Sequence, residues 1–234
     1  MDKNQFNSRW SQLHGGANIT GATKGWLSIS YPMAQFLSQL KITPNILTLS
    51  TIVLSLPILF DPKSSWFLLI AIIAFLSDGL DGSLAIFTQS ESRWGAILDS
   101  WADRITEAFW MWALYLRFLP FFHSHATLLS LLSAVWLGSV IQEYMRARAQ
   151  GLGVKEISIV TVMERPVRAI VTFIFIGALP PVFLHLVSGS SFHWFTHSGN
   201  FFLIFLMLML SFQCAALFQL ARKYYRQLSN PQSL

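Results

Sequence analysis

Long apolar stretches alternate with short polar segments over most of this 234-residue chain. Most of the stretches are long enough to cross the hydrocarbon core of a bilayer as a helix. The pattern therefore predicts an all-α, polytopic membrane protein. The six transmembrane helices that we predict run over residues 45–60, 65–86, 94–117, 126–149, 166–187 and 200–220.

The region before the first predicted span has a different pattern. Residues 1–23 are polar and contain glycine, which predicts a loosely ordered cytoplasmic leader. Over residues 24–40 apolar side chains recur at helical spacing, which predicts an interfacial amphipathic helix kinked or interrupted at Pro32. A helix packed on the bundle with one face in solvent is the alternative. The domains that we expect are a leader with its juxtamembrane helix (1–41), a six-helix membrane domain (42–226) and a cytoplasmic tail (227–234).

Composition and charge support the membrane assignment. The chain is 53% hydrophobic and 12% charged, with a mean hydropathy of +0.51. Its net charge of +5 would suggest nucleic-acid binding in a soluble protein. Here the positive-inside rule and anionic lipid headgroups explain it, so we expect no nucleic-acid partner. With the N-terminus inside, only Lys63 and Arg117 fall in outer loops, which predicts a cell-membrane protein with both termini cytoplasmic.

Four of the six aspartates of the chain fall between residues 77 and 104. Asp78 and Asp81 are three apart and Asp99 and Asp103 are four apart, so on helices each pair shares one face. Carboxylates in apolar helices are costly unless a cation neutralises them. A divalent metal with oxygen ligands is the simplest such cation.

Small residues accompany these acids. Gly82, Ala85 and Gly95 remove side-chain bulk, which lets a ligand or another helix approach the backbone. Two divalent ions bridged by carboxylates would clamp a diphosphate for displacement at phosphorus, with one carboxylate at the edge as general base. The cytoplasmic ends of the second and third spans would then form the active site.

As a spacing, the segment is D-x2-D-G-x2-A, nine residues, then G-x3-D-x3-D. It closely resembles the signature of the CDP-alcohol phosphotransferase (phosphatidyltransferase) family. The resemblance implies a six-helix membrane enzyme, usually a homodimer, with Mg2+ or Mn2+ and two ions per subunit. Such enzymes lie among membrane lipids and transfer a substituted phosphate from a CDP-linked lipid or alcohol to an acceptor hydroxyl, with release of CMP.

The resemblance also assigns residue roles. It implies that Asp103 accepts the proton and that the metal ligands are Asp78, Asp81, Asp99 and Asp103. The positions that it implies for binding the CDP-lipid are Ile42, Thr43, Pro44, Asn45, Gly82, Ala85, Ile86, Ser92 and Gly95. One position departs from the family, because Ile86 stands where the family has an arginine near the CDP phosphates. Our candidates for a compensating cation are Arg93, in the same loop, and a cation from a partner.

Basic residues flank the connection between the fourth and fifth spans. Arginine forks suit bidentate phosphate binding, although dipole interaction and snorkelling also explain arginines at helix ends. The Tyr-x-x-A-R-A and E-R-P-x-R segments are similar to phosphatidylinositol phosphate synthases of actinobacteria and their archaeal relatives. That resemblance implies that the acceptor phosphate is bound by Arg146, Arg148, Arg165 and Arg168. Glu164 is expected to orient one of these arginines by pairing with it.

The function that these patterns predict is transfer of the phosphatidyl group from CDP-diacylglycerol to inositol phosphate. Glycerol 3-phosphate as acceptor would need much the same basic pocket. A divalent-cation transporter is the alternative from another class, because intramembrane acids often mark ion paths. An inactive scaffold is a third alternative, and it is supported only by Ile86.

Overall fold

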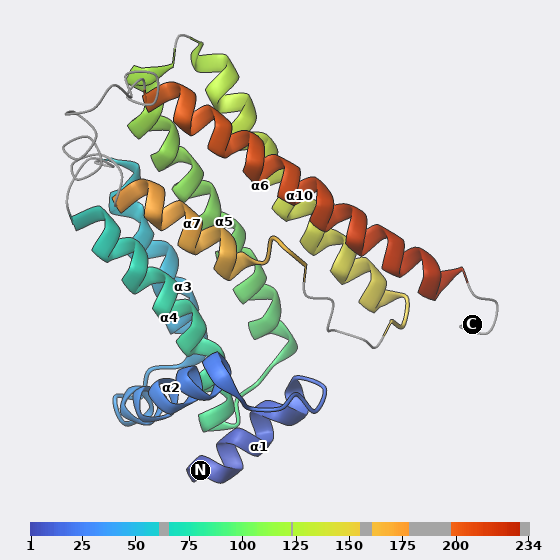
Figure 1. Ribbon diagram of the computed structural model, residues 1–234. Helices are drawn as coiled ribbons and strands as arrows, with labels where there is room; N and C mark the ends of the chain where they lie inside the picture. The colour runs from blue at the N-terminus through green and yellow to red at the C-terminus, as the bar shows by residue number, and fades with distance from the viewer. Residues whose placement is uncertain (61–65, 123, 155–160, 178–197, 230–234) are drawn as a thin grey trace. The chain divides into compact units, whose positions relative to one another are not determined.

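A computed structural model describes residues 1–60, 66–122, 124–154, 161–177 and 198–229. These residues form helices and contain no strand, as the hydrophobic pattern predicts (Figure 1). The chain divides into two compact units, Met1–Pro57 with Leu69–Thr106, and Ile58–Leu68 with Glu107–Leu234. The described elements are α1 (Lys3–Leu13), α2 (Gly21–Gln39), α3 (Pro44–Ser55), η1 (Leu56–Leu59), α4 (Trp66–Thr88), α5 (Arg93–Phe118), η2 (Leu119–Phe121), α6 (His125–Gly151), α7 (Arg165–Gly177) and α10 (Ser198–Leu228).

Three of the described helices are long and apolar enough to cross a membrane: Leu68–Thr88, His125–Gly151 and Phe202–Leu228. Thr23–Gln39 and Pro44–Leu59 pass the same test together, with a bend of 103° between them, and would make a fourth span. The α5 helix is long enough but carries four charged residues from Asp99 to Glu107, so composition alone does not identify it. The count of six spans remains a prediction, and residues 178–187 of the fifth lie outside the described residues.

The α3 helix shows why the chain suits a lipid environment. Its hydroxyl side chains Thr48 and Thr51 are buried, whereas Ile46, Leu49 and Val53 are exposed. Water would favour the opposite arrangement, whereas lipid favours apolar groups outside and hydrogen-bonded polar groups inside.

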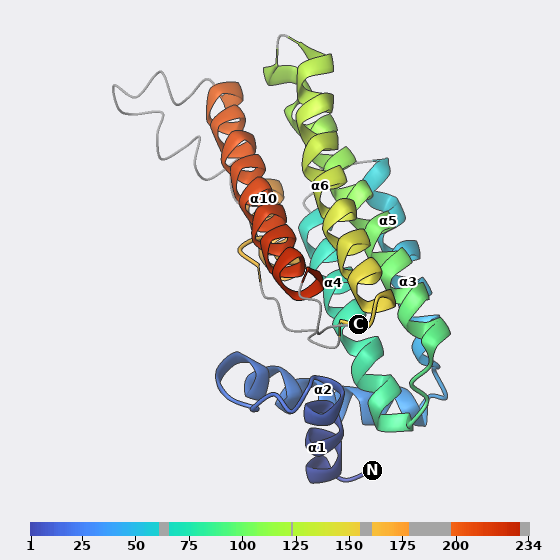
Figure 2. The ribbon, with the colours of Figure 1, turned by 90° about the vertical axis from the view of Figure 1, so that its right-hand side faces the viewer.

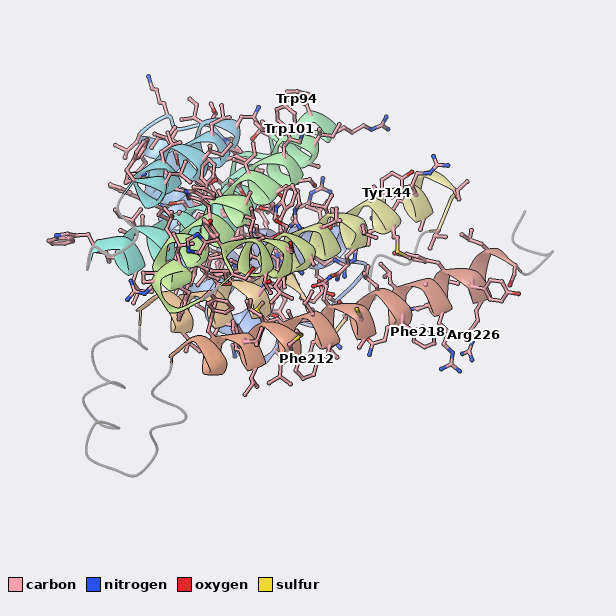
Figure 3. The ribbon with its side chains drawn as sticks, turned by 90° about the horizontal axis from the view of Figure 1, so that it is seen from above. Trp94, Trp101, Tyr144, Phe212, Phe218 and Arg226 are labelled. Carbon is pink, nitrogen blue, oxygen red and sulfur yellow. The ribbon has the colours of Figure 1, made fainter. Side chains whose placement is uncertain are left out.

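Exposed aromatic side chains follow the same rule on other helices. Trp94 and Trp101 project outward from the first turns of α5, and Phe212 and Phe218 are exposed along α10 (Figure 3). Exposed tryptophans at a helix end are typical of anchors at the membrane interface.

The first residues of the chain form a helix, so the prediction of a loosely ordered leader over 1–23 was wrong. Asp2 and Gln5 begin α1 with a reciprocal capping box, in which each side chain accepts a hydrogen bond from the other's backbone N–H. Phe6 is fully buried against Leu27 and Ile86. A single aromatic anchor in an otherwise polar segment therefore docks the helix.

The α2 helix continues through Pro32, so of the kink or interruption predicted there, the interruption is wrong. Tyr31 packs edge-on against Phe6 and Phe87, with ring centroids 5.4 and 5.7 Å apart. Its hydroxyl donates a hydrogen bond to the carbonyl oxygen of Met1. Packing on these neighbours holds the helix where proline removes one backbone donor.

In the second unit, α6 and α10 run side by side (Figure 2). Val135 of α6 and Met209 and Ala216 of α10 form a buried cluster with Met163. The α10 helix extends to Leu228, past the end predicted at residue 220. The extension keeps the basic residues 222–226 within the helix.

We predict that Phe6→Ala releases α1 from the first unit, because removing a buried phenylalanine costs about 3 kcal/mol or more. Hydrogen exchange of the α1 amides should become faster by about two orders of magnitude. Leu13→Ala on the same helix is the control, because Leu13 is exposed. Equal exchange in the two variants would show that Phe6 does not hold the helix.

Candidate active site

Three of the predicted acids converge in the first unit. Asp78 lies on α4, and Asp99 and Asp103 lie on successive turns of α5. Each offers a carboxylate oxygen, and these oxygens lie within 4.8 Å of one another. The cluster joins one acid of the first pair, on α4, with both acids of the second pair, on α5.

This donor set fits a divalent metal. Carboxylate oxygens are the ligands that Mg2+ and Mn2+ prefer. Asp78 is buried among apolar helix residues, where a carboxylate needs compensation by positive charge. The cation Arg104, which sequence reasoning missed, lies 3.7 Å from Asp103 (Nη2 to Oδ2). Binding of a metal would place positive charge among the three acids.

Two hydrogen bonds hold the carboxylate of Asp81. Its Oδ2 accepts a hydrogen bond from the hydroxyl of Thr48 on α3, and its Oδ1 accepts one from the backbone N–H of Gly82 at 2.6 Å. Thr48 was missed in the sequence because nothing in its local pattern distinguishes it from the other hydroxyl residues of α3. Its hydrogen bond fixes the orientation of the Asp81 carboxylate, and the metal-ligand role of Asp81 remains a prediction.

Two of the segments implied in CDP-lipid binding lie together. Thr43 caps α3 by accepting from Ile46 N, and Pro44 follows it as the first helical residue. The N–H of Gly95 donates to Ser92 Oγ at 2.9 Å. A Cβ on Gly95 would lie 3.0 Å from Ser92 Oγ and 3.4 Å from Asn45 Oδ1, so these three residues are neighbours.

Gly82 differs from Gly95 in its surroundings. A Cβ at Gly82 would meet nothing within 4 Å, so the helix backbone has open space there. Ala85, one turn later, and Ile42 before α3 are partly buried. Their roles in CDP-lipid binding remain predictions, as do those of Gly82 and Pro44.

Ile86 is buried beneath the N-terminal helices, in the cluster with Phe6 and Leu27. Where the family has an arginine, this chain thus has an apolar contact that holds α1. The α1 helix also brings a cation to the same loop, because Arg9 Nε donates to Glu91 Oε1 at 2.9 Å. Arg9 carries no motif, so sequence reasoning missed it.

The four arginines predicted to bind the acceptor phosphate, here called the basic cluster, belong to the second unit. Arg146 donates from Nη2 to Glu164 Oε1 at 2.5 Å, which confirms that Glu164 pairs with one of the predicted arginines. Arg148 is exposed near the end of α6, and Arg165 is half-buried at the start of α7. Their phosphate-binding roles remain predictions.

Arg168 lies in a buried ion pair. Its Nε and Nη2 donate to Glu107 Oε1 at 3.1 and 2.8 Å, and its Nη1 donates to the carbonyl oxygen of Met163. Ser139 donates to the other Glu107 oxygen at 2.8 Å. These contacts give Arg168 a structural role, and a contact with the acceptor phosphate remains a prediction.

The surroundings of Glu164 control its ionisation. Burial alone would raise its pKa, but hydrogen bonds from Arg146 and from the N–H and hydroxyl of Thr161 outweigh burial. The pKa of Glu164 is therefore lowered from its ordinary value of 4.5. The carboxylate is ionised at neutral pH and can orient Arg146.

We predict that Thr48→Val lowers metal affinity about tenfold, because hydrogen bonds that orient ligands commonly contribute that much. Mn2+ binding to the purified protein, followed by electron paramagnetic resonance, measures the change. Thr51→Val is the control, because its hydroxyl donates only to the carbonyl oxygen of Thr48. Equal affinities in the two variants would exclude this role for Thr48.

A second prediction concerns the stability of the protein at low pH. Because the folded pKa of Glu164 is lowered, its stabilising contribution is complete above pH 4.5 and is lost as the pH falls through the folded value. The difference in melting temperature between wild type and Glu164→Gln should therefore shrink on acidification. Glu143→Gln is the control, because the Glu143 carboxylate also faces Arg146 but lies 3.9 Å from it, which is too far for a hydrogen bond. A difference that does not change with pH would contradict this account.

Comparisons with known proteins find relatives of this chain in sequence and in structure. Among curated proteins, the archaetidylinositol phosphate synthase of Aeropyrum pernix is 33% identical over 147 residues, which are 61% of this chain and 70% of the relative. Two crystal structures of the Mycobacterium tuberculosis phosphatidylinositol phosphate synthase share the fold. One, with manganese and citrate, has a TM-score of 0.60 at 20% identity and covers 88% of this chain and 91% of the other. The second, with CDP-DAG bound, has a TM-score of 0.61 at 21% identity and covers 88% and 97%.

The sequence profile described as CDP-alcohol phosphatidyltransferase matches residues 41–204. The match spans α3 to α7 and includes all four acids and the basic cluster. This chain therefore belongs to the CDP-alcohol phosphatidyltransferase family, whose members transfer a phosphatidyl group from CDP-diacylglycerol to an alcohol.

Proposed function

We propose that this protein transfers the phosphatidyl group of CDP-diacylglycerol to inositol phosphate, giving phosphatidylinositol phosphate and CMP. The observation that carries the proposal is the three-carboxylate cluster of Asp78, Asp99 and Asp103 within the family match. The inositol phosphate acceptor is supported by the names of the relatives and by the arginines of the second unit.

The reaction is a displacement at the phosphorus that bears diacylglycerol. A hydroxyl oxygen of the acceptor forms the new P–O bond, and the bond from phosphorus to the CMP oxygen breaks. CMP leaves with the bonding electron pair, and the hydroxyl proton passes to the carboxylate of Asp103. The aspartates would hold a divalent metal, which would supply positive charge to the diphosphate and the leaving group.

The other aspartates and their partners have supporting roles. Asp78, Asp81 and Asp99 would hold the metal with Asp103, and Thr48 would keep the Asp81 carboxylate oriented. Two Mg2+ ions per subunit, replaceable by Mn2+, fit a site with four carboxylates. Asn45, Ser92 and Gly95 would contact the CDP part of the donor.

The acceptor is recognised through its phosphate in this proposal. Arg146, Arg148, Arg165 and Arg168 would supply the guanidinium groups, with Glu164 orienting Arg146. Glycerol 3-phosphate carries the same phosphate, so it is the acceptor to test against. Membership of a transferase family argues against the alternative of ion transport.

The proposed orientation in the membrane follows from the distribution of positive charge. The concentration of Lys and Arg on one set of segments supports a site on the cytoplasmic face of the cell membrane, with both termini inside. Soluble inositol phosphate would reach the site there, while the lipid donor enters from the bilayer. A homodimer is proposed from the resemblance to the family.

The test is turnover by purified protein in detergent with Mg2+ and labelled CDP-diacylglycerol. Inositol phosphate, glycerol 3-phosphate and free inositol are offered separately, and CMP and lipid product are followed. We expect product with inositol phosphate, and a loss of about 100-fold or more in Asp103→Asn. Asp2→Asn is the matched control, because asparagine also caps a helix.

The outcomes separate the alternatives. Product with glycerol 3-phosphate alone would retain the family reaction and change the acceptor. If no CMP forms with any acceptor, the result would support an inactive scaffold, the alternative that Ile86 suggests. Full activity in Asp103→Asn would exclude Asp103 as the proton acceptor.

A further inference from the structure

Two buried glutamines connect α6 and α10. Gln142 of α6 and Gln213 of α10 are each 2% exposed, and Gln213 Nε2 donates to Gln142 Oε1 at 3.0 Å. The two helices run side by side (Figure 2). Amide groups in apolar surroundings are costly unless they are hydrogen-bonded, so each glutamine constrains the other.

A glycine makes room for this contact. A Cβ at Gly138 of α6 would lie 2.5 Å from Cγ and 3.2 Å from Cδ of Gln213. The side chain of Gln213 therefore lies directly on the α6 backbone, one turn before Gln142. The close approach fixes where its amide group can lie.

The hydrogen bonds continue beyond the helix pair. Gln142 Nε2 donates to Thr161 Oγ1 at 2.8 Å, and Thr161 Oγ1 donates to Glu164 Oε1 at 2.8 Å. The N–H of Thr161 donates to the same oxygen at 2.6 Å, and Arg146 donates to it from Nη2 at 2.5 Å. Each donor in the series lies on the side away from Glu164, so the series of hydrogen bonds ends on the Glu164 carboxylate, which also binds Arg146.

Helix association alone does not account for this arrangement. Amide pairs often join membrane helices, and the bond between Gln213 and Gln142 fits that role. The remaining donor bonds lead from the helix pair into the segment 161–164 and end at Glu164, which also accepts a hydrogen bond from Arg146. Thr161 is itself buried and receives its hydrogen bond from Gln142, so its hydroxyl has one orientation.

We propose that Gln213, Gln142 and Thr161 are positioning residues that fix the Glu164–Arg146 pair for binding the phosphate of the acceptor. The inference rests on the proposed function, because it takes Arg146 as a ligand of that phosphate. It adds that α10, which carries none of the family motifs, helps to determine acceptor affinity without touching the acceptor.

The physical reason is preorganisation. A guanidinium has five N–H donors in a rigid plane, so it can pair with Glu164 and still bind a phosphate. Glu164 Oε1 accepts hydrogen bonds from two atoms of Thr161, which fixes the carboxylate and therefore the plane of Arg146. Without these bonds the arginine must be ordered when the acceptor binds, and acceptor affinity falls.

Matched variants test the inference. Thr161→Val removes the hydroxyl at nearly constant shape, and Thr161→Ser restores it. Gln213→Leu removes the amide from α10, and Gln219→Leu makes the same change at an exposed position of that helix. For each protein, KM is measured for the acceptor and for CDP-diacylglycerol, and calorimetry measures binding of inositol phosphate and glycerol 3-phosphate.

We expect Thr161→Val and Gln213→Leu to raise both KM and Kd for the phosphorylated acceptor by about fivefold, the effect of one hydrogen bond. KM for CDP-diacylglycerol should stay within about twofold, because the donor does not use this pair. Thr161→Ser and Gln219→Leu should resemble the wild type. Equal increases in both KM values, or a lower melting temperature with unchanged acceptor affinity, would overturn the inference.

The acceptors separate this inference from the proposed function. If the wild type uses glycerol 3-phosphate instead of inositol phosphate, the proposed acceptor is wrong, and the same selective rise in KM for glycerol 3-phosphate would still support the inference. If the wild type binds neither phosphorylated alcohol and uses a free alcohol, the inference is overturned as well.

Discussion

The cost of burying charge in apolar helices governs this structure. In the second unit, Glu107 and Arg168 meet that cost by pairing with each other, and Ser139 and a backbone carbonyl satisfy further groups. In the first unit, carboxylates of three aspartates converge within 4.8 Å. Acids gathered in this way favour binding of a cation, and oxygen ligands suit a divalent metal.

The same constraint explains where the polar side chains lie. Thr48 is buried on α3 and holds Asp81, while the apolar residues of that helix face outward. Gln142 and Gln213 are buried between α6 and α10, where their amides bind each other. In lipid the interior of the bundle is the favourable place for hydrogen-bonding groups, so the structural and the functional polar residues share it.

The departure of this chain from the family signature has a structural counterpart. An arginine at position 86 would place a charge in the cluster that Phe6 and Leu27 fill. Ile86 instead completes that cluster and helps to hold α1. The same helix carries Arg9 to Glu91, next to Ser92. The N-terminal helix thus contacts α4 through Ile86 and the following loop through Glu91.

Local spacing predicted the all-α class, most helix bounds and the three acids that converge, because helical periodicity and the family motif lie within short stretches. Only the tertiary structure decided which distant residues meet. Thr48 and Asp81 are 33 positions apart and Gln142 and Gln213 are 71 apart, so no local pattern relates them. The α1 helix was missed for the same reason, because burial of Phe6 depends on Leu27 and Ile86. Hydrogen bonds and burial between such residues depend on how the helices pack.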